Sequence, residues 1–287
     1  MTVLPAFLDA HIHLCLIDPS TLLAGGIGRV LDLGGLRGDE TNGLPETAYA
    51  NQFLTAPGGY PARRSWAQPG SVATVATSAE AAAAVDRQAL AGASVVKITL
   101  NSVAGPVLAD DVLAAVVARA RERRLPVVAH AEGVGQALRA FTAGVDIYAH
   151  TPFSERLDDD LVEAMAARMS WISTLDIHGW GTPTDDFTRA SDNLARFHAA
   201  GGHVLYGTDL GNGPLPVGLN RREIEALLAA GLSPDAVIAA LTSTGGLEWA
   251  WDRVTVIPGP RPSDPAAFVD WICTARARAA TEVKEDL

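Results

Sequence analysis

Apolar residues along the chain fall into two kinds of run, and their alternation predicts the fold class. Short β-rich runs predict eight strands, at 6–13, 28–33, 51–56, 94–100, 126–130, 145–150, 171–175 and 203–208. Longer stretches rich in Ala, Leu and Arg have helical spacing, most clearly at 79–91, 110–123, 158–168, 188–200 and 221–230. Strands that alternate with helices are typical of an α/β fold with a parallel sheet, and eight strands favour closure into a (β/α)8 TIM barrel.

The same pattern predicts one large domain followed by a short appendage. No linker or repeat interrupts the chain before about residue 255, so we predict that residues 1–254 form the barrel. A Pro-rich segment at 258–265 then breaks regular structure, and we expect 255–287 to be a C-terminal appendage. The total of 287 residues is close to the roughly 250 residues of a (β/α)8 barrel.

Composition and charge narrow the classes of partner. With 22 Lys and Arg against 33 Asp and Glu, the net charge is −11, which repels phosphate backbones and anionic membranes. The two cysteines, Cys15 and Cys273, are too few for a disulfide framework, and no apolar run is long enough to span a bilayer. We therefore expect a cytoplasmic protein with a small-molecule substrate and with neither nucleic acid nor membrane as a partner. A homo-oligomer is compatible with the sequence.

Two histidines end the first predicted strand. Side chains two residues apart on a strand share a face, so His11 and His13 point together into the mouth of the barrel. Neutral imidazole is a common ligand of divalent transition metals, and this pair supplies two coordination positions. A structural or hydrogen-bonding role is equally open unless partners exist elsewhere in the chain.

A lysine interrupts the fourth predicted strand. Lys97 lies between Val95-Val96 and Ile98, and such a strand is buried on both faces. Burial lowers the pKa of lysine and exposes a nucleophilic amine. If that amine captures carbon dioxide, the resulting carbamate is an anionic oxygen ligand that can bridge two cations. The alternative is a lysine paired with a carboxylate.

Three further polar residues lie at the carboxyl ends of predicted strands: His130, His150 and Asp209. This end of a (β/α)8 barrel is the catalytic face. Seven strand-to-strand steps separate His13 from Asp209, at about 28 residues each, which is the size of a βα unit. The candidate ligands therefore fall on strands one, four, five, six and eight, although each alone is equally a hydrogen-bonded structural residue.

This ordered set resembles the metal-dependent amidohydrolase superfamily, over roughly residues 5 to 250. The resemblance implies that His11, His13 and Asp209 hold the more buried of two divalent ions, that His130 and His150 hold the more exposed one, and that a Lys97 carboxylated by carbon dioxide (N6-carboxylysine) bridges both. Zinc is favoured, with iron or manganese as alternatives.

Two segments are similar to one subgroup of the superfamily, and one feature of the sequence departs from the pattern of many members. Residues 54–61 and 231–234 are similar to segments of prolidase-like members. Many members flank the barrel with a β-sandwich, but strand one begins almost at Met1 here, so we expect little or none of that sandwich. The segment 254–259 is similar to a remnant of its C-terminal half.

The expected function is hydrolysis of an amide, ester, lactone or related carbonyl bond in a small, apolar substrate. A hydroxide shared by the two ions would attack the carbonyl, and Asp209 would pass its proton to the leaving group. His178, on a loop after strand seven, is expected to bind the substrate or its oxyanion, with a surface position equally open. Asp9 has the parity to orient a ligand histidine. Trp66, Phe153 and Trp180 on the loops favour an apolar substrate, or else simple packing.

Three other functions stay open. A mononuclear deaminase would not need Lys97 and would use a carboxylate near strand five, where Glu132 is the local candidate. A non-heme diiron oxygenase could use the same nitrogen and oxygen ligands. A binding or structural barrel without activity would keep the fold and lose ligands, and none is missing from this sequence.

Overall fold

The computed structural model describes residues 1–35, 44–250 and 252–285, in which parallel strands alternate with helices. The strands of the barrel are β2 (Phe7–Ile12), β3 (Ile27–Asp32), β4 (Glu46–Tyr49), β5 (Phe53–Thr55), β7 (Val96–Asn101), β8 (Val127–Glu132), β9 (Ile147–Tyr148), β10 (Ser170–Ile172) and β11 (His203–Leu205). All the predicted strands are found, with ends shifted by a few residues. The (β/α)8 fold class is confirmed.

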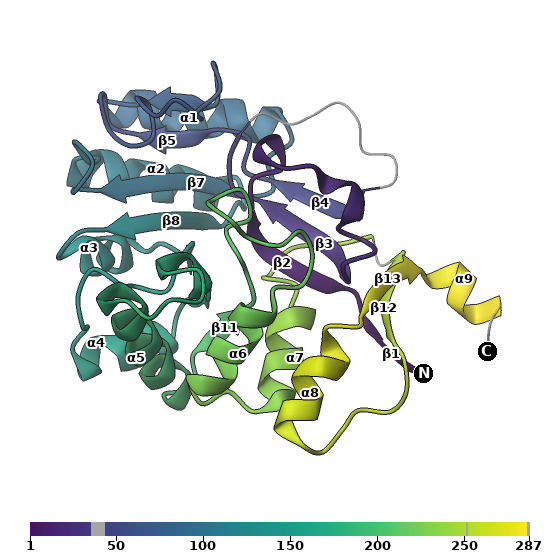
Figure 1. Ribbon diagram of the computed structural model, residues 1–287. Helices are drawn as coiled ribbons and strands as arrows, with labels where there is room; N and C mark the ends of the chain where they lie inside the picture. Colours follow the sequence, from purple (N-terminus) through teal and green to yellow (C-terminus); the bar gives the residue numbers. More distant parts are fainter. Residues whose placement is uncertain (36–43, 251, 286–287) are drawn as a thin grey trace.

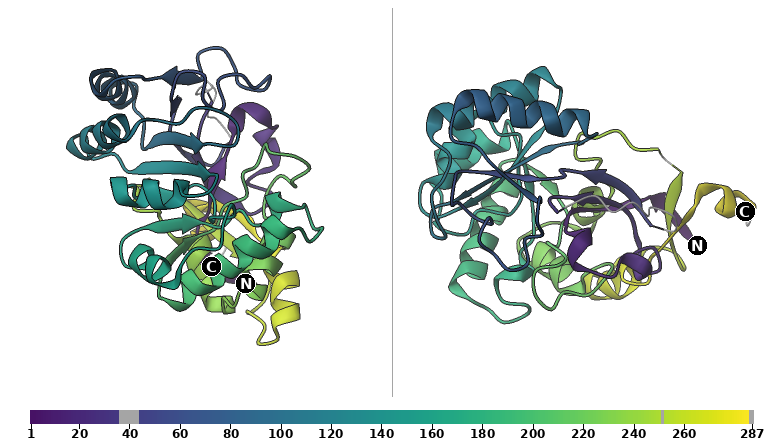
Figure 2. Two further views of the ribbon diagram at one scale, coloured as in Figure 1. Left: turned by 90° about the vertical axis from the view of Figure 1, so that its left-hand side faces the viewer. Right: turned by 90° about the horizontal axis from the view of Figure 1, so that it is seen from above.

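Seven helices follow these strands and cover their outer side, as Figures 1 and 2 show for the helices beside β7 and β8. They are α1 (Ser78–Leu90), α2 (Asp110–Glu122), α3 (Gln136–Ala143), α4 (Asp159–Ala166), α5 (Asp185–Ala199), α6 (Arg221–Ala229) and α7 (Pro234–Thr242). Several begin at a polar cap. The hydroxyls of Thr77 and Thr184 accept the N–H groups of Glu80 and Phe187, which satisfies amides that the first helical turn leaves unpaired.

The ladders form two parallel sheets rather than one continuous ring, which corrects the expectation of full closure. One sheet has the order β11-β10-β9-β8-β7-β5-β6, with β6 (Val72–Thr74) at its edge, and the other has the order β2-β3-β4. The predicted strand 51–56 is found as β5, whereas β4 was not predicted; Asn51, whose φ of 61° leaves the extended region, separates the two strands. The chain changes partner at this point: β4 pairs with β3, while β5 pairs with β7.

A few backbone hydrogen bonds join the two sheets on both sides. The N–H of Ser94, before β7, donates to the carbonyl of Tyr49 at 2.7 Å. On the other side, Ala10 N–H donates to Tyr206 O at 2.9 Å, and His13 N–H donates to Leu210 O at 2.8 Å. The first strand is thereby attached to the segment that follows the last strand.

The interior of the barrel has an apolar floor. Val95, Val128 and Leu205 belong to a buried cluster inside the strands, separate from the larger core between strands and helices. Two residues further along β7 and β8, on the same faces, come Lys97 and His130. Strand alternation thus carries polar side chains to a position directly above this floor.

Both ends of the chain contribute to a small antiparallel sheet outside the barrel. It has the order β1-β12-β13, from β1 (Thr2–Pro5), β12 (Arg253–Ile257) and β13 (Arg276–Ala279), and it lies near both termini in Figure 1. We did not expect β1, because four residues before a proline give too short a pattern. Helix α8 (Pro265–Ile272) buries Phe268 and Ile272 in the main core, and α9 (Ala280–Glu285) ends the described chain. The domain boundary at residue 254 stays a prediction.

A helix that could cross a membrane would need both length and an apolar surface, and none of the helices in the described ranges has both.

Thr255 provides a test of how the small sheet supports the first barrel strand. The N–H of Phe7 donates to Thr255 Oγ1 at 2.9 Å, and both residues are fully buried. Thr255→Val keeps the shape of the side chain but leaves that N–H unpaired, so we expect the free energy of unfolding to fall by about 1–3 kcal/mol. Urea denaturation measures the change. Thr74→Val, at an exposed position of β6, should alter it by less than about 0.5 kcal/mol, and equal effects of the two substitutions would contradict the argument.

Candidate functional site

One cavity of about 230 Å³ collects all six of the ligand candidates from the sequence, His11, His13, Lys97, His130, His150 and Asp209. They come from β2 and the residue after it, from β7 and β8, and from the segments that follow β9 and β11. The remaining wall consists of aromatic and polar side chains: Phe53, Tyr60, Trp66, Thr99, Glu132, Phe153, Ile177, His178, Trp180 and Asn212. The aromatic loop residues Trp66, Phe153 and Trp180 thus line the same space.

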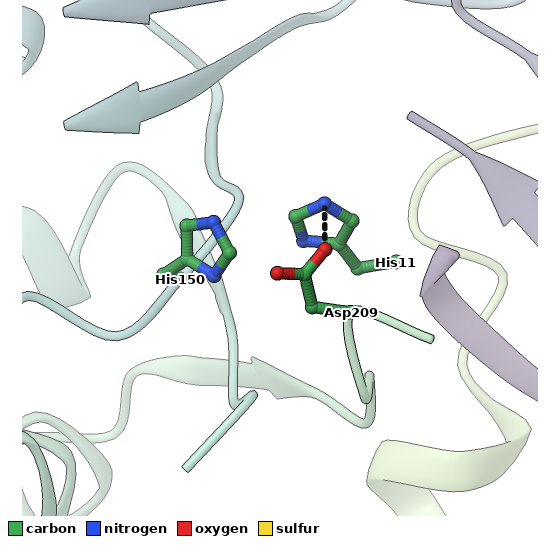
Figure 3. A group of neighbouring side chains, drawn as sticks. All are labelled: His11, His150 and Asp209. Carbon is green, nitrogen blue, oxygen red and sulfur yellow. Dashed lines mark ion pairs between the residues drawn. The ribbon is translucent and has the colours of Figure 1, made fainter. Parts of the chain in front are cut away.

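The innermost group is a carboxylate shared by two imidazoles. Asp209 Oδ1 lies 3.1 Å from His11 Nε2 and 3.1 Å from His13 Nε2, and all three side chains are buried. One ligand atom from each of His11, His150 and Asp209 lies within 4.8 Å of the others. Figure 3 shows the Asp209 carboxylate between the rings of His11 and His150. This spacing suits donors that converge on one cation.

Three of the histidines are oriented by hydrogen bonds at Nδ1. His11 Nδ1 contacts the carbonyl of Ala149 at 2.8 Å, and His13 Nδ1 contacts the carbonyl of Gly34 at 2.9 Å. Both carbonyls can only accept, so Nδ1 of each ring carries a proton, and in His11, whose pKa burial lowers, Nε2 presents a lone pair. His150 Nδ1 lies 2.9 Å from the Thr174 hydroxyl. Burial holds the pKa of His11 and of His150 well below the usual range, so these rings are neutral.

The backbone places the carboxylate of Asp209. Its φ of 56° lies in the left-handed region, which non-glycine residues seldom adopt, directly after the last strand. Asn212 Nδ2 donates to Oδ2 at 2.9 Å, and this leaves Oδ1 to the two histidines. Burial would raise the pKa of Asp209, but its interactions with the surrounding imidazoles of His11, His13 and His150 together hold that pKa well below its usual range. The group is therefore a carboxylate.

Lys97 is 1% exposed, and none of the ion pairs formed by the described residues includes it. The pairing with a carboxylate that the sequence left open is thus not seen in this part of the chain. Burial lowers the pKa of Lys97 to about 7, against the opposing charges of Asp209 and Asp32. A substantial fraction of the amine is consequently uncharged and nucleophilic near neutral pH.

His130 is held differently from the other three histidines. Its Nε2 lies 3.0 Å from Glu132 Oε2, two residues further along β8, and Glu132 accepts a second hydrogen bond from Asn101 Nδ2 at 2.6 Å. Asn101 in turn accepts the backbone N–H groups of Val103 and Ala104 with its Oδ1. The hydrogen bond with His130 lowers the pKa of Glu132, despite its partial burial. A second carboxylate therefore faces the cavity.

His178 lies in the cavity wall, on the short turn η3 (Asp176–His178), and not on the outer surface. Its ring packs against Phe153 with centroids 4.3 Å apart, and its Nε2 is buried without a hydrogen-bond partner among the described residues. Burial lowers the pKa of His178 to about 4, so the ring is neutral. The turn is anchored because Arg222 Nε and Asn220 Nδ2 donate to the buried carboxylate of Asp176 at 2.9 and 2.7 Å.

Two other polar residues, Asp9 and His203, have structural contacts and lie outside the set of candidate ligands. Asp9 accepts the backbone N–H of His11 and both the N–H and the hydroxyl of Thr208, so it fixes the backbone rather than a histidine ring. His203, which was not a candidate site residue, opens β11 at the opposite end of the barrel, where it contacts the hydroxyls of Ser170 and Ser243. Asn101 and Thr174 were not predicted from the sequence, although Asn101 shares the strand parity of Lys97 and could have been found from it.

Comparisons with known proteins agree with this geometry. The model of the Amidohydrolase family matches residues 2–246. The comparison with curated proteins gives no match. Among solved structures, the chain resembles A. niger ochratoxinase, with a TM-score of 0.76 and 16% identity over 95% of this chain and 81% of that one.

Two other solved structures share the fold. A Xaa-Pro dipeptidase with bound methionine in its active site has a TM-score of 0.72 and 18% identity, over 96% of this chain and 84% of that one. A molinate hydrolase has a TM-score of 0.73 and 15% identity, over 96% of this chain and 82% of that one. The family match covers most of the chain, and the chain therefore belongs to the amidohydrolase family and is a metal-dependent hydrolytic enzyme.

Proposed function

We propose that this enzyme uses two divalent metal ions to hydrolyse an amide, ester, lactone or related carbonyl bond in a small, apolar substrate. The observation that carries the proposal is the convergence of six nitrogen and oxygen donors, from five separate strands or their ends, on one cavity of about 230 Å³. The solved structures of similar fold include proteins whose names describe a dipeptidase and two hydrolases of small organic molecules, which supports this reaction class.

The donor set fits such ions on grounds of its own. His11 Nε2 is buried without a hydrogen bond, and it faces Asp209 Oδ1 at 3.1 Å, so two acceptor lone pairs meet with no proton between them. An arrangement of this kind costs free energy unless a cation lies between the donors. Imidazole and carboxylate are also the ligands that zinc, manganese and iron share.

By this proposal, His11, His13 and Asp209 would hold the more buried ion, His130 and His150 would hold the more exposed one, and Lys97 would supply a shared ligand as its carbamate. To form the carbamate, the neutral amine bonds to the carbon of carbon dioxide and releases one proton. The low exposure of Lys97 and its pKa of about 7 support this step. When bound, the ions would supply a water of lowered pKa and polarise the carbonyl of the substrate.

The chain's own groups would then handle the proton and the developing charge. Asp209, kept ionised and held by Asn212, would accept a proton from the attacking water and return it to the leaving group. His178 is neutral and lines the cavity, and its buried Nε2 has no hydrogen-bond partner among the described residues. In the tautomer with a proton on Nε2, it would donate a hydrogen bond to the carbonyl oxygen as that oxygen becomes negative.

The cavity wall favours an uncharged substrate. Tyr60 and Phe53 both pack near Trp66, with ring centroids 6.0 Å apart in each case, and they give one side of the cavity an aromatic surface. Among the described residues that line the cavity, Lys97 is the only lysine or arginine. Since the proposal assigns Lys97 to the ions, this part of the wall offers no cation to a substrate carboxylate. A volume of about 230 Å³ also restricts the substrate to a small molecule.

Metal content separates this proposal from the other functions that the ligands allow. We expect protein purified without added metal to contain two zinc or manganese ions per chain by elemental analysis. We also expect it to cleave a panel of N-acyl anilides and aryl esters without consuming oxygen. Two iron ions with oxygen consumption would instead indicate an oxygenase, and a single ion with release of ammonia would indicate a deaminase.

Asp209→Asn tests the role of the carboxylate. The amide keeps the size of the side chain but no longer accepts a proton, so kcat on the best substrate of the panel should fall by about 10²–10⁴-fold. The comparison is made at equal metal content, established by elemental analysis of each sample. Asp160→Asn, on the exposed face of α4, is the matched control and should leave kcat unchanged. Near-normal turnover of Asp209→Asn with both ions bound would refute the assignment.

Lys97→Ala tests the bridging carbamate. Without the amine the enzyme should lose at least one of its two ions and its activity, and added acetate or propionate should restore part of both, because a short carboxylate can take the place of the carbamate. Zinc-loaded enzyme exposed to 13C-bicarbonate should show a carbamate signal by 13C NMR that Lys97→Ala lacks. A metal-replete wild-type enzyme without that signal would rule out carboxylation.

A further inference from the structure

A second cavity, of about 320 Å³, adjoins the one that holds the six ligand candidates. Five residues line both cavities: His13, Tyr60, Trp66, Asp209 and Asn212. The second cavity, which we call the side chamber, adds three residues of its own: Leu16, Gly211 and Gly213. Because the two cavities share this much of their walls, a molecule bound beside the ligand candidates can extend into the side chamber.

Two aromatic rings form part of the shared wall. The rings of Tyr60 and Trp66 have centroids 6.0 Å apart and are inclined by 65°, which is an edge-to-face arrangement. The Trp66 ring also lies 6.4 Å from the imidazole of His13. Aromatic side chains offer a large apolar surface and a favourable geometry to another aromatic ring. This wall therefore suits a flat, aromatic part of a ligand.

The loop after β11 contributes backbone rather than side chains to the side chamber. Gly211 and Gly213 have φ angles of 114° and 79°, which favour glycine. A Cβ at Gly211 would lie 3.0 Å from the Cβ of Leu16, and a Cβ at Gly213 would lie 2.5 Å from the ring of Trp180. Leu16, on the short turn η1 (Leu14–Leu16), is thus the only aliphatic side chain among the described residues that line the chamber.

The charge of the side chamber excludes an acidic group. Among the described residues that line it, Asp209 is the only aspartate, glutamate, lysine or arginine. The guanidinium of Arg64 lies 5.5 Å from the ring of Tyr60, but Arg64 is exposed and does not line the chamber. A carboxylate placed here would lose water without gaining a cationic partner. An uncharged group fits better.

The position of Asp209 gives the direction in which a substrate lies. In the proposed reaction Asp209 returns a proton to the leaving group, while His178 donates to the carbonyl oxygen. Asp209 lines both cavities, whereas His178, His130 and His150 line only the first. The atom that receives the proton must lie next to Asp209, so the group attached to that atom is directed towards the side chamber.

We propose that the side chamber receives the leaving group of the substrate, and that this leaving group is an uncharged aromatic amine or alcohol. The inference rests on the proposed function, because the role of Asp209 sets the direction. It adds the substrate class: amides or esters in which the ring is attached to the nitrogen or oxygen of the bond that is cleaved, and not to the carbonyl carbon.

Esters with a ring on one side or the other of the carbonyl test the proposal. Phenyl acetate has an aromatic leaving group, ethyl benzoate has an aromatic acyl group, and ethyl acetate has neither. Leu16→Trp fills the side chamber, so the ratio of kcat/KM for phenyl acetate to that for ethyl acetate should fall by at least about tenfold. Each ratio is compared with that of the wild type at equal metal content, so the intrinsic reactivity of the esters cancels. A larger fall for ethyl benzoate than for phenyl acetate would place the acyl group in the chamber and overturn the proposal.

Binding of a free aromatic alcohol gives a readout that needs no turnover. The metal-containing wild-type enzyme should bind 2-naphthol in equilibrium dialysis, and Leu16→Trp should weaken this binding by at least about tenfold. The compound 6-hydroxy-2-naphthoate adds a carboxylate to the same ring system and should bind more weakly than 2-naphthol. Tighter binding of the carboxylate would show that the chamber does not select an uncharged group.

Two further variants make the result specific. Leu90→Trp, at an exposed position of α1, is the matched control and should leave the ratios and the 2-naphthol affinity unchanged. Leu16→Ala makes the opposite change in size, so it should raise kcat/KM for 2-naphthyl acetate relative to phenyl acetate. This keeps the proposal open to disproof if thermal unfolding shows that Leu16→Trp does not fold.

The outcomes separate this inference from the proposed function. If folded Leu16→Trp changes neither the phenyl acetate ratio nor the binding of 2-naphthol, the side chamber does not hold the leaving group. If 2-naphthol binds as expected but the wild type, with two ions bound, hydrolyses none of the esters or anilides, the proposed hydrolysis is wrong and the aromatic chamber stands.

Discussion

The pairing of the first barrel strand with the segment after the last strand is the contact on which both fold and site depend. Ile12 bridges Leu210, and His13 N–H donates to Leu210 O. Asp209 is the residue before this bridge, and His11 and His13 stand on either side of Ile12. The backbone hydrogen bonds that join the two sheets therefore also bring the shared carboxylate to the two imidazoles, at 3.1 Å each. Any displacement of this contact between the first strand and the segment after the last strand would move His11, His13 and Asp209 relative to one another.

Strand periodicity explains how much of the site could be predicted from the sequence. The side chains of a strand alternate between two faces, and parallel strands present their carboxyl ends together, so local rules bring Lys97 and His130 to the same mouth. Those rules need no knowledge of which strands are neighbours. The convergence of the six candidates on one cavity follows from them, and the structure does bring the six together.

What could not be predicted depends on contacts between distant parts of the chain. Strand β4, before Asn51, pairs with β3, whereas β5, after it, pairs with β7, and no local pattern records this change of partner. Strand β1 exists because residues 254–257 lie beside it. Asp9 has the parity of a residue that could touch a histidine ring, yet Thr208, 199 residues away, takes its carboxylate instead. Parity restricts where a side chain points, but the partner it meets is set by the whole fold.

The polar groups of the site oppose folding unless something binds them. Lys97 and Asp209 are almost completely buried, and His11 Nε2 and His178 Nε2 have no hydrogen-bond partners among the described residues. Each unsatisfied buried polar group costs about 1–3 kcal/mol of folding free energy. The apolar floor of Val95, Val128 and Leu205 leaves no room for water molecules that could hydrogen-bond to these groups from that side. The same floor lowers the pKa of Lys97 by excluding water around the amine. The burial that lowers the stability of the metal-free protein therefore also favours metal binding. The donor atoms are already desolvated, so they lose no hydration when a cation binds.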